Sequence, residues 1–167
     1  MTTTEKETSA TVNGRLIAVN RSHLRTEPKT AGVSGELVAG YGLVGDAHAG
    51  LNEREVALIA VAEIEAFNRT HQLGAGPGSF ADNLTIAELD LTQLQVGDQL
   101  HVGPTLLEVV QLGKPRSQAH SYNFKGHSIL PDVGVFCRVL EGGPVQQGAT
   151  VTILPASQRI HKVRERI

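Results

Sequence analysis

Residues 94–113 read LQVGDQLHVGPTLLEVVQLG, and this stretch decides the fold class of the chain. Two β-prone runs, Gln99–Val102 and Thr105–Leu112, flank a Gly-Pro pair that is typical of a tight turn. Residues 133–154, VGVFCRVLEGGPVQQGATVTIL, repeat this arrangement. In both segments a glycine stands at the entry of a strand. The two segments therefore predict consecutive short strands joined by glycine turns.

The remainder of the chain adds strands and one helix. The segments GRLIAVN, GELVAG and REVALI, at residues 14–20, 35–40 and 54–59, indicate further strands. Residues 60–71, AVAEIEAFNRTH, change to helical spacing of apolar side chains, and the Gly- and Pro-rich residues 72–83 indicate a loop. Many short strands with one clear internal helix predict a mainly β fold. We expect a closed or nearly closed β-barrel with a few short helices.

The domain organisation follows from length and composition. A chain of 167 residues is long enough for one domain with a single core. Residues 1–12 are polar and lack apolar periodicity, which predicts a flexible tail. We expect the domain over residues 13–155 and a C-terminal helix or tail over residues 156–167, with a solvated basic face.

Composition excludes several classes of protein. Aromatic residues make up 4% of the chain and the formal net charge is -2, so neither stacking platforms nor a basic field for nucleic acid is expected. No apolar run is long enough to span a membrane and no signal peptide is recognisable, so we expect a soluble cytoplasmic protein that does not bind membranes. The single cysteine excludes an internal disulfide and a cysteine-rich zinc site.

Several polar residues stand beside glycines rather than on strand faces, and four of them are cations. Lysine and arginine around glycine-rich backbone suit an anion with several oxygens, because arginine offers a planar fork and exposed N–H groups add donors. Taken singly, each lysine or arginine is more typical of a solvated surface than of a binding site. The candidate binding residues are Lys29, Asp46, His48, Arg54, Asn83, Lys114 and Arg116.

The loop Gly42–Gly50, GLVGDAHAG, is the most unusual of these positions, because it holds three glycines with one acid and one histidine. Glycine loses the most backbone freedom on folding, so this loop must be held in place or must hold a ligand. Asp46 can form an Asx-turn, and a loop histidine such as His48 can be merely capped or solvated. The spacing of the other histidines matches no metal motif, so no metal site is predicted.

Cys137 lies in the strand-like run VFCRV and shares a strand face with Val135 and Val139. Two β-branched neighbours make this face typical of a core. A buried structural thiol is therefore expected, and burial without a nearby cation makes a thiol unreactive.

Taken in order, several segments resemble the MOSC domain, the family named for the C-terminal domain of molybdenum-cofactor sulfurase. They are VNRS, PK, GLVGDAHAG, REVALI, PGSFADNLTI, LDLTQLQVGDQLHVG, LEVVQLGKP and GVFCRVLEGG. The resemblance runs from about Gly14 to Leu154 and is specific in its order and spacing. The chain is identified as a small stand-alone member of the bacterial type.

The resemblance implies a barrel similar to that of the pyruvate kinase β-barrel domain. It also implies a pocket for the molybdenum cofactor, a pterin (molybdopterin) with a phosphate and a metal-oxo group, or for a related anion. Family members are associated with carrying or modifying sulfur, with reduction of N-hydroxylated compounds and with binding of pyridoxal phosphate. A molybdoenzyme is an expected partner. Within the family pattern the loop Gly42–Gly50 lines the pocket, and Arg54 and Asn83 match polar positions.

One departure from the family pattern bears on the chemistry. Bacterial members often carry a cysteine after a Gly-Lys pair, where it is the sulfur or metal contact, and this chain has Arg116 there. A further family cysteine aligns near Ser128. Arginine cannot form a persulfide, but it keeps a permanent charge and five donors. The resemblance therefore implies oxyanion binding more readily than sulfur transfer.

Three hypotheses remain open from the sequence, and whether the protein is an enzyme remains open with them. The leading hypothesis is a pocket that binds the molybdenum cofactor or a similar anion. The second is a sulfur carrier or transferase in which Cys137 replaces the missing cysteine, or a molybdenum-dependent reductase. The third is a barrel without a ligand that binds a partner protein. Burial of Cys137 disfavours the second, and convergence of the polar candidates disfavours the third.

Overall fold

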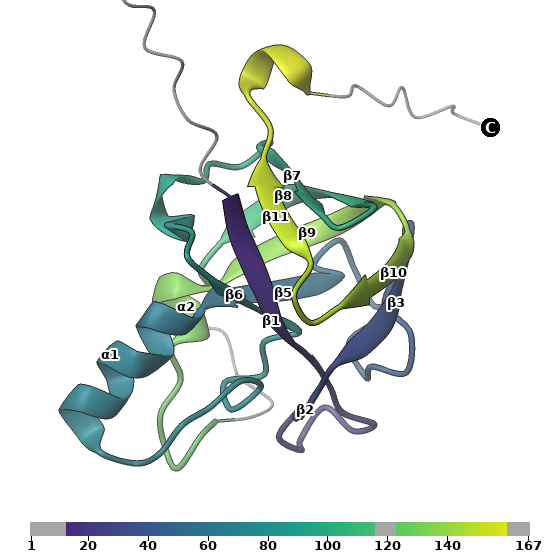
Figure 1. The fold of residues 1–167 in the computed structure, drawn as a ribbon. Helices are drawn as coiled ribbons and strands as arrows, with labels where there is room; N and C mark the ends of the chain where they lie inside the picture. The colour runs from purple at the N-terminus through teal and green to yellow at the C-terminus, as the bar shows by residue number, and fades with distance from the viewer. Residues whose placement is uncertain (1–12, 116–122, 160–167) are drawn as a thin grey trace, which may run out of the picture.

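The computed structural model describes residues 13–115 and 123–159, and its strands form a barrel (Figure 1). The strands are β1 (Asn13–Arg21), β2 (Thr30–Gly32), β3 (Ser34–Val38), β4 (Gly42–Leu43), β5 (Val56–Ala60), β6 (Leu84–Ala87), β7 (Gln99–Val102), β8 (Thr105–Leu112), β9 (Val135–Glu141), β10 (Gly143–Gln146) and β11 (Thr150–Ile153). The helices are α1 (Val61–His71) and α2 (Leu130–Val133), with short 3-10 turns at Leu91–Gln93 and Ala156–Gln158.

Seven of the described strands close into a ring, which confirms the predicted barrel. The order around the ring is β1, β11, β7, β8, β9, β5 and β6, and β6 then pairs with β1. The short strand β2 pairs with the far end of β1. The strands β10, β3 and β4 form a separate antiparallel sheet at the side of the barrel (Figure 1).

The hairpin of β7 and β8 has the bounds that its sequence predicts. Its antiparallel register places Val102 opposite Thr105, so the chain reverses over Gly103 and Pro104. Strand β8 then pairs with β9 along most of its length. Local turn chemistry and β-prone runs agree here with the barrel, which is why this part of the fold is readable from sequence.

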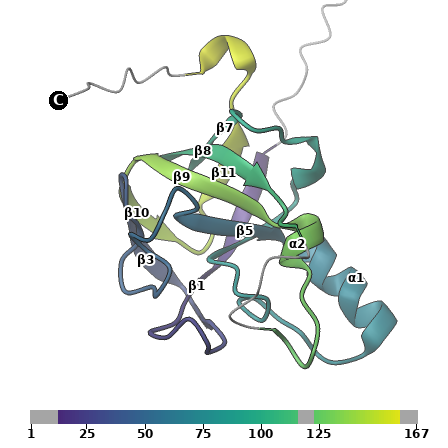
Figure 2. The same ribbon diagram turned by 180° about the vertical axis from the view of Figure 1, so that it is seen from behind.

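Strand β5, helix α1 and β6 form a parallel β-α-β unit on the barrel wall. All five residues of β5 are buried because its two faces pack on different clusters. Val56 and Leu58 belong to the core inside the barrel. Ile59 packs outside it with Ile64 and Phe67 of α1, and Figure 2 shows α1 lying against the outside of the strands. The predicted helix over residues 60–71 is thus confirmed.

Several short elements add to the sequence prediction. Helix α2 and strands β2, β4 and β6 are not anticipated, because two to four residues are too short to show a period. Of the predicted C-terminal helix, the structure has one 3-10 turn at Ala156–Gln158, and residues 160–167 lie outside the described part, as does the predicted tail over residues 1–12. No helix within the described ranges is long and apolar enough to cross a membrane.

Candidate functional site

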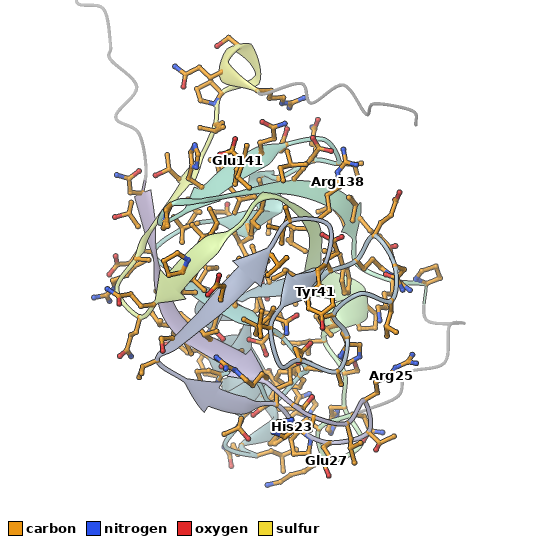
Figure 3. The ribbon with its side chains drawn as sticks, turned by 90° about the vertical axis from the view of Figure 1, so that its right-hand side faces the viewer. His23, Arg25, Glu27, Tyr41, Arg138 and Glu141 are labelled. Atoms are coloured by element: carbon orange, nitrogen blue, oxygen red, sulfur yellow. The ribbon has the colours of Figure 1, made fainter. Side chains whose placement is uncertain are left out.

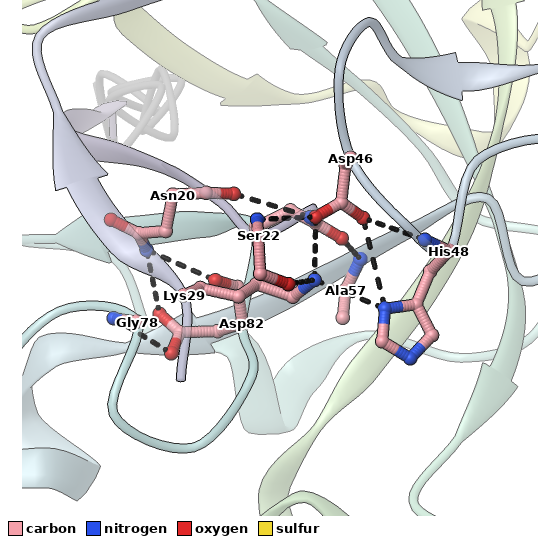
Figure 4. A network of polar contacts seen from close by, with 9 residues as sticks. Asn20, Ser22, Lys29, Asp46, His48, Ala57, Gly78 and Asp82 are labelled. Atoms are coloured by element: carbon pink, nitrogen blue, oxygen red, sulfur yellow. Dashed lines mark hydrogen bonds and ion pairs between the residues drawn. The ribbon is translucent and has the colours of Figure 1, made fainter. Parts of the chain in front are cut away.

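The carboxylate of Asp46 ties the loop Gly42–Gly50 to the end of β1 (Figure 4). Its Oδ1 accepts hydrogen bonds from the backbone N–H of Ser22 at 3.1 Å and from Lys29 Nζ at 2.6 Å. Its Oδ2 accepts from the backbone N–H of His48 at 3.2 Å. The backbone N–H of Ala47 adds a bond to the Ser22 carbonyl at 2.8 Å. The glycine-rich loop is therefore fixed by a buried acid, and it presents His48 beside that acid.

Lys29 is buried against Asp46, and all three of its protons have an acceptor. The side chains of the two residues are 1% and 0% exposed. Nζ also lies 3.0 Å from His48 Nδ1 and 3.4 Å from Ser22 Oγ. Burial lowers the pKa of Lys29, while Asp46 offsets this effect. Burial would raise the pKa of Asp46, but the hydrogen bond and charge of Lys29 more than reverse this and bring it below its usual range. The two groups form a buried ion pair.

His48 is neutral in this setting. Burial lowers its pKa to about 4, and the charge of Lys29 adds to the effect while Asp46 opposes it. Its side chain is 31% exposed. His48 Nδ1 faces Lys29, whereas the other ring nitrogen is turned away from Lys29 and Asp46 (Figure 4). Within the described part of the chain, Nε2 makes no hydrogen bond.

Asn83 joins strands β1 and β5 next to this loop, and its side chain also helps to lower the pKa of Asp46 by hydrogen bonding. Its Oδ1 accepts from the backbone N–H of Ala57 at 3.0 Å, and its Nδ2 donates to the Asn20 carbonyl at 3.3 Å. A further layer lies behind Asn20, whose Nδ2 donates to Asp82 Oδ2 at 3.2 Å and to Thr85 Oγ1 at 2.9 Å. Asn83 is 2% exposed. Its amide therefore holds strands and loop together inside the protein.

Arg54 and Lys114 meet beside the ring of Phe136 on the outer face of β9. Lys114 Nζ lies 5.1 Å from the ring centroid and Arg54 Cζ lies 6.0 Å from it. Burial lowers the pKa of Lys114, and the charges of Arg54 and Arg25 add to this effect. Arg25 extends from the loop between β1 and β2 (Figure 3). The charges of Arg25 and Lys114 also lower the pKa of His48, so both cations lie near enough to act on it.

Three cations of this region have no carboxylate partner within residues 13–115 and 123–159. Across the described ranges, Arg25, Arg54 and Lys114 make no ion pair with a carboxylate. Lys114 is held in place through its backbone, since its N–H donates to the Pro131 carbonyl at 3.0 Å. The residue before it, Gly113, has φ +65°, and a Cβ there would lie 2.3 Å from the same carbonyl oxygen. Only glycine fits this close approach.

Two cavities bear on this region. One of about 340 Å³ is lined by Arg54 together with Asn52, Glu53, Val110 and Gln111, so it opens next to the cations.

The other cavity, of about 570 Å³, lies between the first turn of α1, α2 and the ends of β5 and β6. It is mostly apolar, and none of the predicted site residues lines it. Size alone would favour the second cavity, but Arg54, which lies with Lys114 beside Phe136, lines the first.

The structure brings most of the predicted residues together. Lys29, Asp46, His48 and Asn83 form one hydrogen-bonded cluster. The charge of Lys114 acts on His48, and Arg54 lies with Lys114 beside Phe136. Arg116 falls outside the described residues. Whether these residues bind a ligand stays a prediction.

Sequence reasoning misses four residues of this region. Asn20 and Ser22 lie in the segment VNRS and Asp82 in PGSFADNLTI, so a signal was present in the motifs. Arg25 has no sequence signal.

Cys137 is fully buried, as predicted. It is 0% exposed and belongs to the core inside the barrel, and burial raises the pKa of its thiol far above the usual range. Its neighbour Phe136 belongs to the cluster outside the barrel. Because successive side chains of a strand point to opposite faces, β9 directs Phe136 toward the cations and Cys137 away from them.

The sequence model of the MOSC domain family matches residues 45–152, which is more than half of the chain. The chain belongs to the MOSC domain family. The matched region includes His48, Arg54, Asn83 and Lys114, whereas Lys29 precedes it. The family is associated with functions related to the molybdenum cofactor. Among curated proteins, no sequence match to the chain is found.

Solved structures share this MOSC fold. YiiM from Geobacillus stearothermophilus superposes with a TM-score of 0.65 and 18% identity, over 85% of this chain and 75% of that one. The YuaD protein APC1665 from Bacillus subtilis gives 0.67 and 16%, over 84% and 95% of the two chains. YiiM from Escherichia coli gives 0.58 and 20%, over 89% and 72%. At these identities the likeness supports the fold alone.

The donor set of this MOSC protein fits the anionic part of a molybdenum cofactor. Phosphate and oxo groups accept hydrogen bonds, and the site offers two partly buried cations and the outward nitrogen of His48. A thiolate ligand for the metal is not at hand, because Cys137 is the only cysteine of the chain and lies inside the barrel. Among the described residues, no group of three or more His, Cys, Asp and Glu side chains is arranged to hold a metal.

Proposed function

We propose that this MOSC protein binds the molybdenum cofactor, or a related oxyanionic ligand, between His48, Arg54 and Lys114. The observation that carries the proposal is a group of cations, Arg25, Arg54 and Lys114, that have no carboxylate partner among the described residues and of which two act on a neutral His48. Lys29, Asp46 and Asn83 support the site from behind, because their polar atoms are engaged within the protein. The cofactor, when bound, would supply the redox-active metal centre.

Electrostatics favour an anion at this place. The pKa of Lys114 is lowered by burial and by Arg54 and Arg25, so its charge is disfavoured in the free protein. A phosphate or oxo anion between these groups would relieve the repulsion and accept charge-assisted hydrogen bonds. Part of the binding free energy would therefore come from relief of the repulsion between these cations in the free protein.

Sulfur transfer through a cysteine is not supported by this geometry. The thiolate is the nucleophile, and both burial and a raised pKa suppress it at Cys137. The convergence of cations also gives no support to a barrel that has lost its ligand. We therefore favour binding of the cofactor over the sulfur-carrier and partner-module alternatives. A molybdoenzyme as partner and a cytoplasmic location stay predictions.

The test measures pterin retained by the protein. Purified protein is incubated with molybdopterin, separated from free pterin by gel filtration and measured by pterin fluorescence. The wild-type protein should retain pterin. Arg54→Ala and Lys114→Ala should each lose about tenfold to a hundredfold in affinity, as removal of a charge-assisted contact costs about 1.5–3 kcal/mol.

Arg69→Ala is the matched control, since Arg69 is an exposed cation in the last turn of α1. It should retain pterin as the wild-type protein does. The proposal is wrong if the wild-type protein retains no pterin, or if all three variants bind alike.

A further inference from the structure

The ammonium group of Lys29 fixes the hydrogen bonding of His48. An ammonium has three protons to donate and no lone pair to accept with. Asp46 Oδ1, His48 Nδ1 and Ser22 Oγ lie 2.6, 3.0 and 3.4 Å from Lys29 Nζ. These are three acceptors for three protons, so Nδ1 of His48 must offer its lone pair. The single ring proton of neutral His48 is then on Nε2.

Asp46 cannot reverse this assignment. His48 Nδ1 lies 3.8 Å from Asp46 Oδ2, which is too long for a hydrogen bond. That oxygen already accepts from the backbone N–H of His48 at 3.2 Å. The ionisable and charged groups that act on the ring are Lys29, Asp46, Arg25 and Lys114, of which three are cations. A second proton on the ring is therefore disfavoured.

We infer that Lys29 locks His48 as an outward Nε2–H donor, so that the site selects oxyanions whose oxygens are all acceptors. This inference rests on the proposed function and names its ligand class: sulfate, molybdate, or a fully ionised phosphate group such as that of a pterin. A protonated oxyanion brings an O–H group that needs an acceptor. Of the charged groups that act on His48, Lys29, Arg25 and Lys114 can only donate, while both oxygens of Asp46 already accept hydrogen bonds. A buried O–H without a partner weakens binding.

The tautomer can be measured without any ligand. Long-range proton–nitrogen NMR spectra of the side-chain imidazoles, recorded on free protein near neutral pH, distinguish Nε2–H from Nδ1–H and from imidazolium. We expect His48 as Nε2–H. Either of the other forms overturns the inference, and the wild-type protein suffices for this measurement.

The ligand class is tested by pH. Sulfate keeps its charge, whereas a phosphate monoester such as methyl phosphate has a second pKa of about 6. If only the dianion binds, affinity for methyl phosphate relative to sulfate should fall about tenfold between about pH 7.5 and about pH 5. His48 remains neutral over this range, because its pKa is about 4. An unchanged ratio overturns the inference.

Two variants of His48 distinguish its outward Nε2–H donor from the acceptor that it offers to Lys29. In His48→Asn the amide oxygen can still accept from Lys29, but no donor reaches outward, so sulfate affinity should fall about tenfold. In His48→Gln the longer amide reaches the position of Nε2 and should restore most of that affinity. Equal loss in both variants overturns the donor role.

Failure of the proposed anion binding and failure of the present inference give different results. If neither sulfate nor methyl phosphate binds while His48 is Nε2–H, the anion-binding function itself is wrong, and its ligand class with it. If both bind while His48 has another tautomer, only the present inference is wrong.

Discussion

At the scale of single residues, the buried pair of Lys29 and Asp46 organises the site. Burial of an ion pair removes both charged groups from water. Their attraction compensates for this loss of hydration only when further hydrogen bonds satisfy the remaining polar atoms. Here Ser22 and the backbone of His48 supply those bonds. The pair therefore has a positioning role, because it fixes the loop and the ring of His48 together.

Breaking this pair should be costly. Asp46→Asn keeps the shape of the side chain but leaves Lys29 as a buried charge without its partner, and we expect a loss of about 3–5 kcal/mol in the free energy of unfolding. Urea denaturation measures this loss. Glu88→Gln, which breaks the exposed pair with Arg15, should cost no more than about 1 kcal/mol. A similar small loss for Asp46→Asn would contradict the role assigned to the pair.

His48 should make stability depend on pH. Its pKa is about 4 in the folded protein and ordinarily 6.5, so the unfolded chain binds more protons between these values. The free energy of unfolding should therefore fall as pH decreases from 6.5 to about 4. The contribution of Asp46, whose pKa is lowered from 3.8, is lost only at still lower pH. Urea denaturation at several pH values should show a shallower slope in this window for His48→Asn, and an identical slope would contradict the assignment.

At the scale of elements, a single glycine joins β8 to the turn that carries Lys114. Gly113 has φ +65° and approaches the carbonyl of Pro131, the second residue of α2. Lys114 then donates to the same carbonyl. The position of the lysine thus depends on the contact between β8 and α2, and a side chain at Gly113 would separate them.

Two alanine substitutions isolate this effect. Gly74 has nearly the same backbone, with φ +69°, but nothing lies near its absent Cβ. Gly74→Ala should cost only the left-handed strain of about 1–2 kcal/mol, whereas Gly113→Ala adds a clash worth about 1–3 kcal/mol. Thermal or urea denaturation should rank them in that order. Equal losses would show that the close approach to Pro131 does not constrain the chain.

The elements also show how much of the fold can be predicted from the sequence. The β7–β8 hairpin and α1 are predictable because their signals are local: a Gly-Pro turn between β-prone runs, and apolar residues at helical spacing. Helix α2 has four residues and no period to read.

At the site, Lys29, Asp46 and His48 could be picked out as polar residues beside glycines. Their contacts join two loops far apart in sequence, and a pattern cannot supply such contacts. Arg25 lies in a polar segment in which no sequence pattern distinguishes one polar side chain from its neighbours.

At the scale of the whole molecule, the closed barrel separates a buried thiol inside it from a group of cations on its outer wall. Its interior holds Cys137 in an apolar core, while its outer wall presents the cations beside Phe136. Pairing of β1 with β11 closes the ring, so its strands have no unpaired edge beside this core. The thiol and the polar site therefore lie on opposite sides of one strand, β9.

This separation predicts the reactivity of Cys137. Thiol reagents should label the native protein slowly, at a rate set by opening of the barrel, and should label the protein quickly in denaturant. Mass spectrometry follows both reactions. Rapid native labelling, or a persulfide after exposure to a sulfur donor, would restore the sulfur-carrier hypothesis.

The central claim is that an oxyanion binds between His48, Arg54 and Lys114, and a heavy oxyanion can locate it directly. Crystals of the protein soaked in tungstate, a close analogue of molybdate, would show bound tungsten by its anomalous scattering. The account predicts a tungstate whose oxygens lie within hydrogen-bonding distance of His48 Nε2 and Lys114 Nζ, about 3 Å. Tungstate found only elsewhere, for example in the apolar cavity near α2, or no ordered tungstate at all, would contradict it.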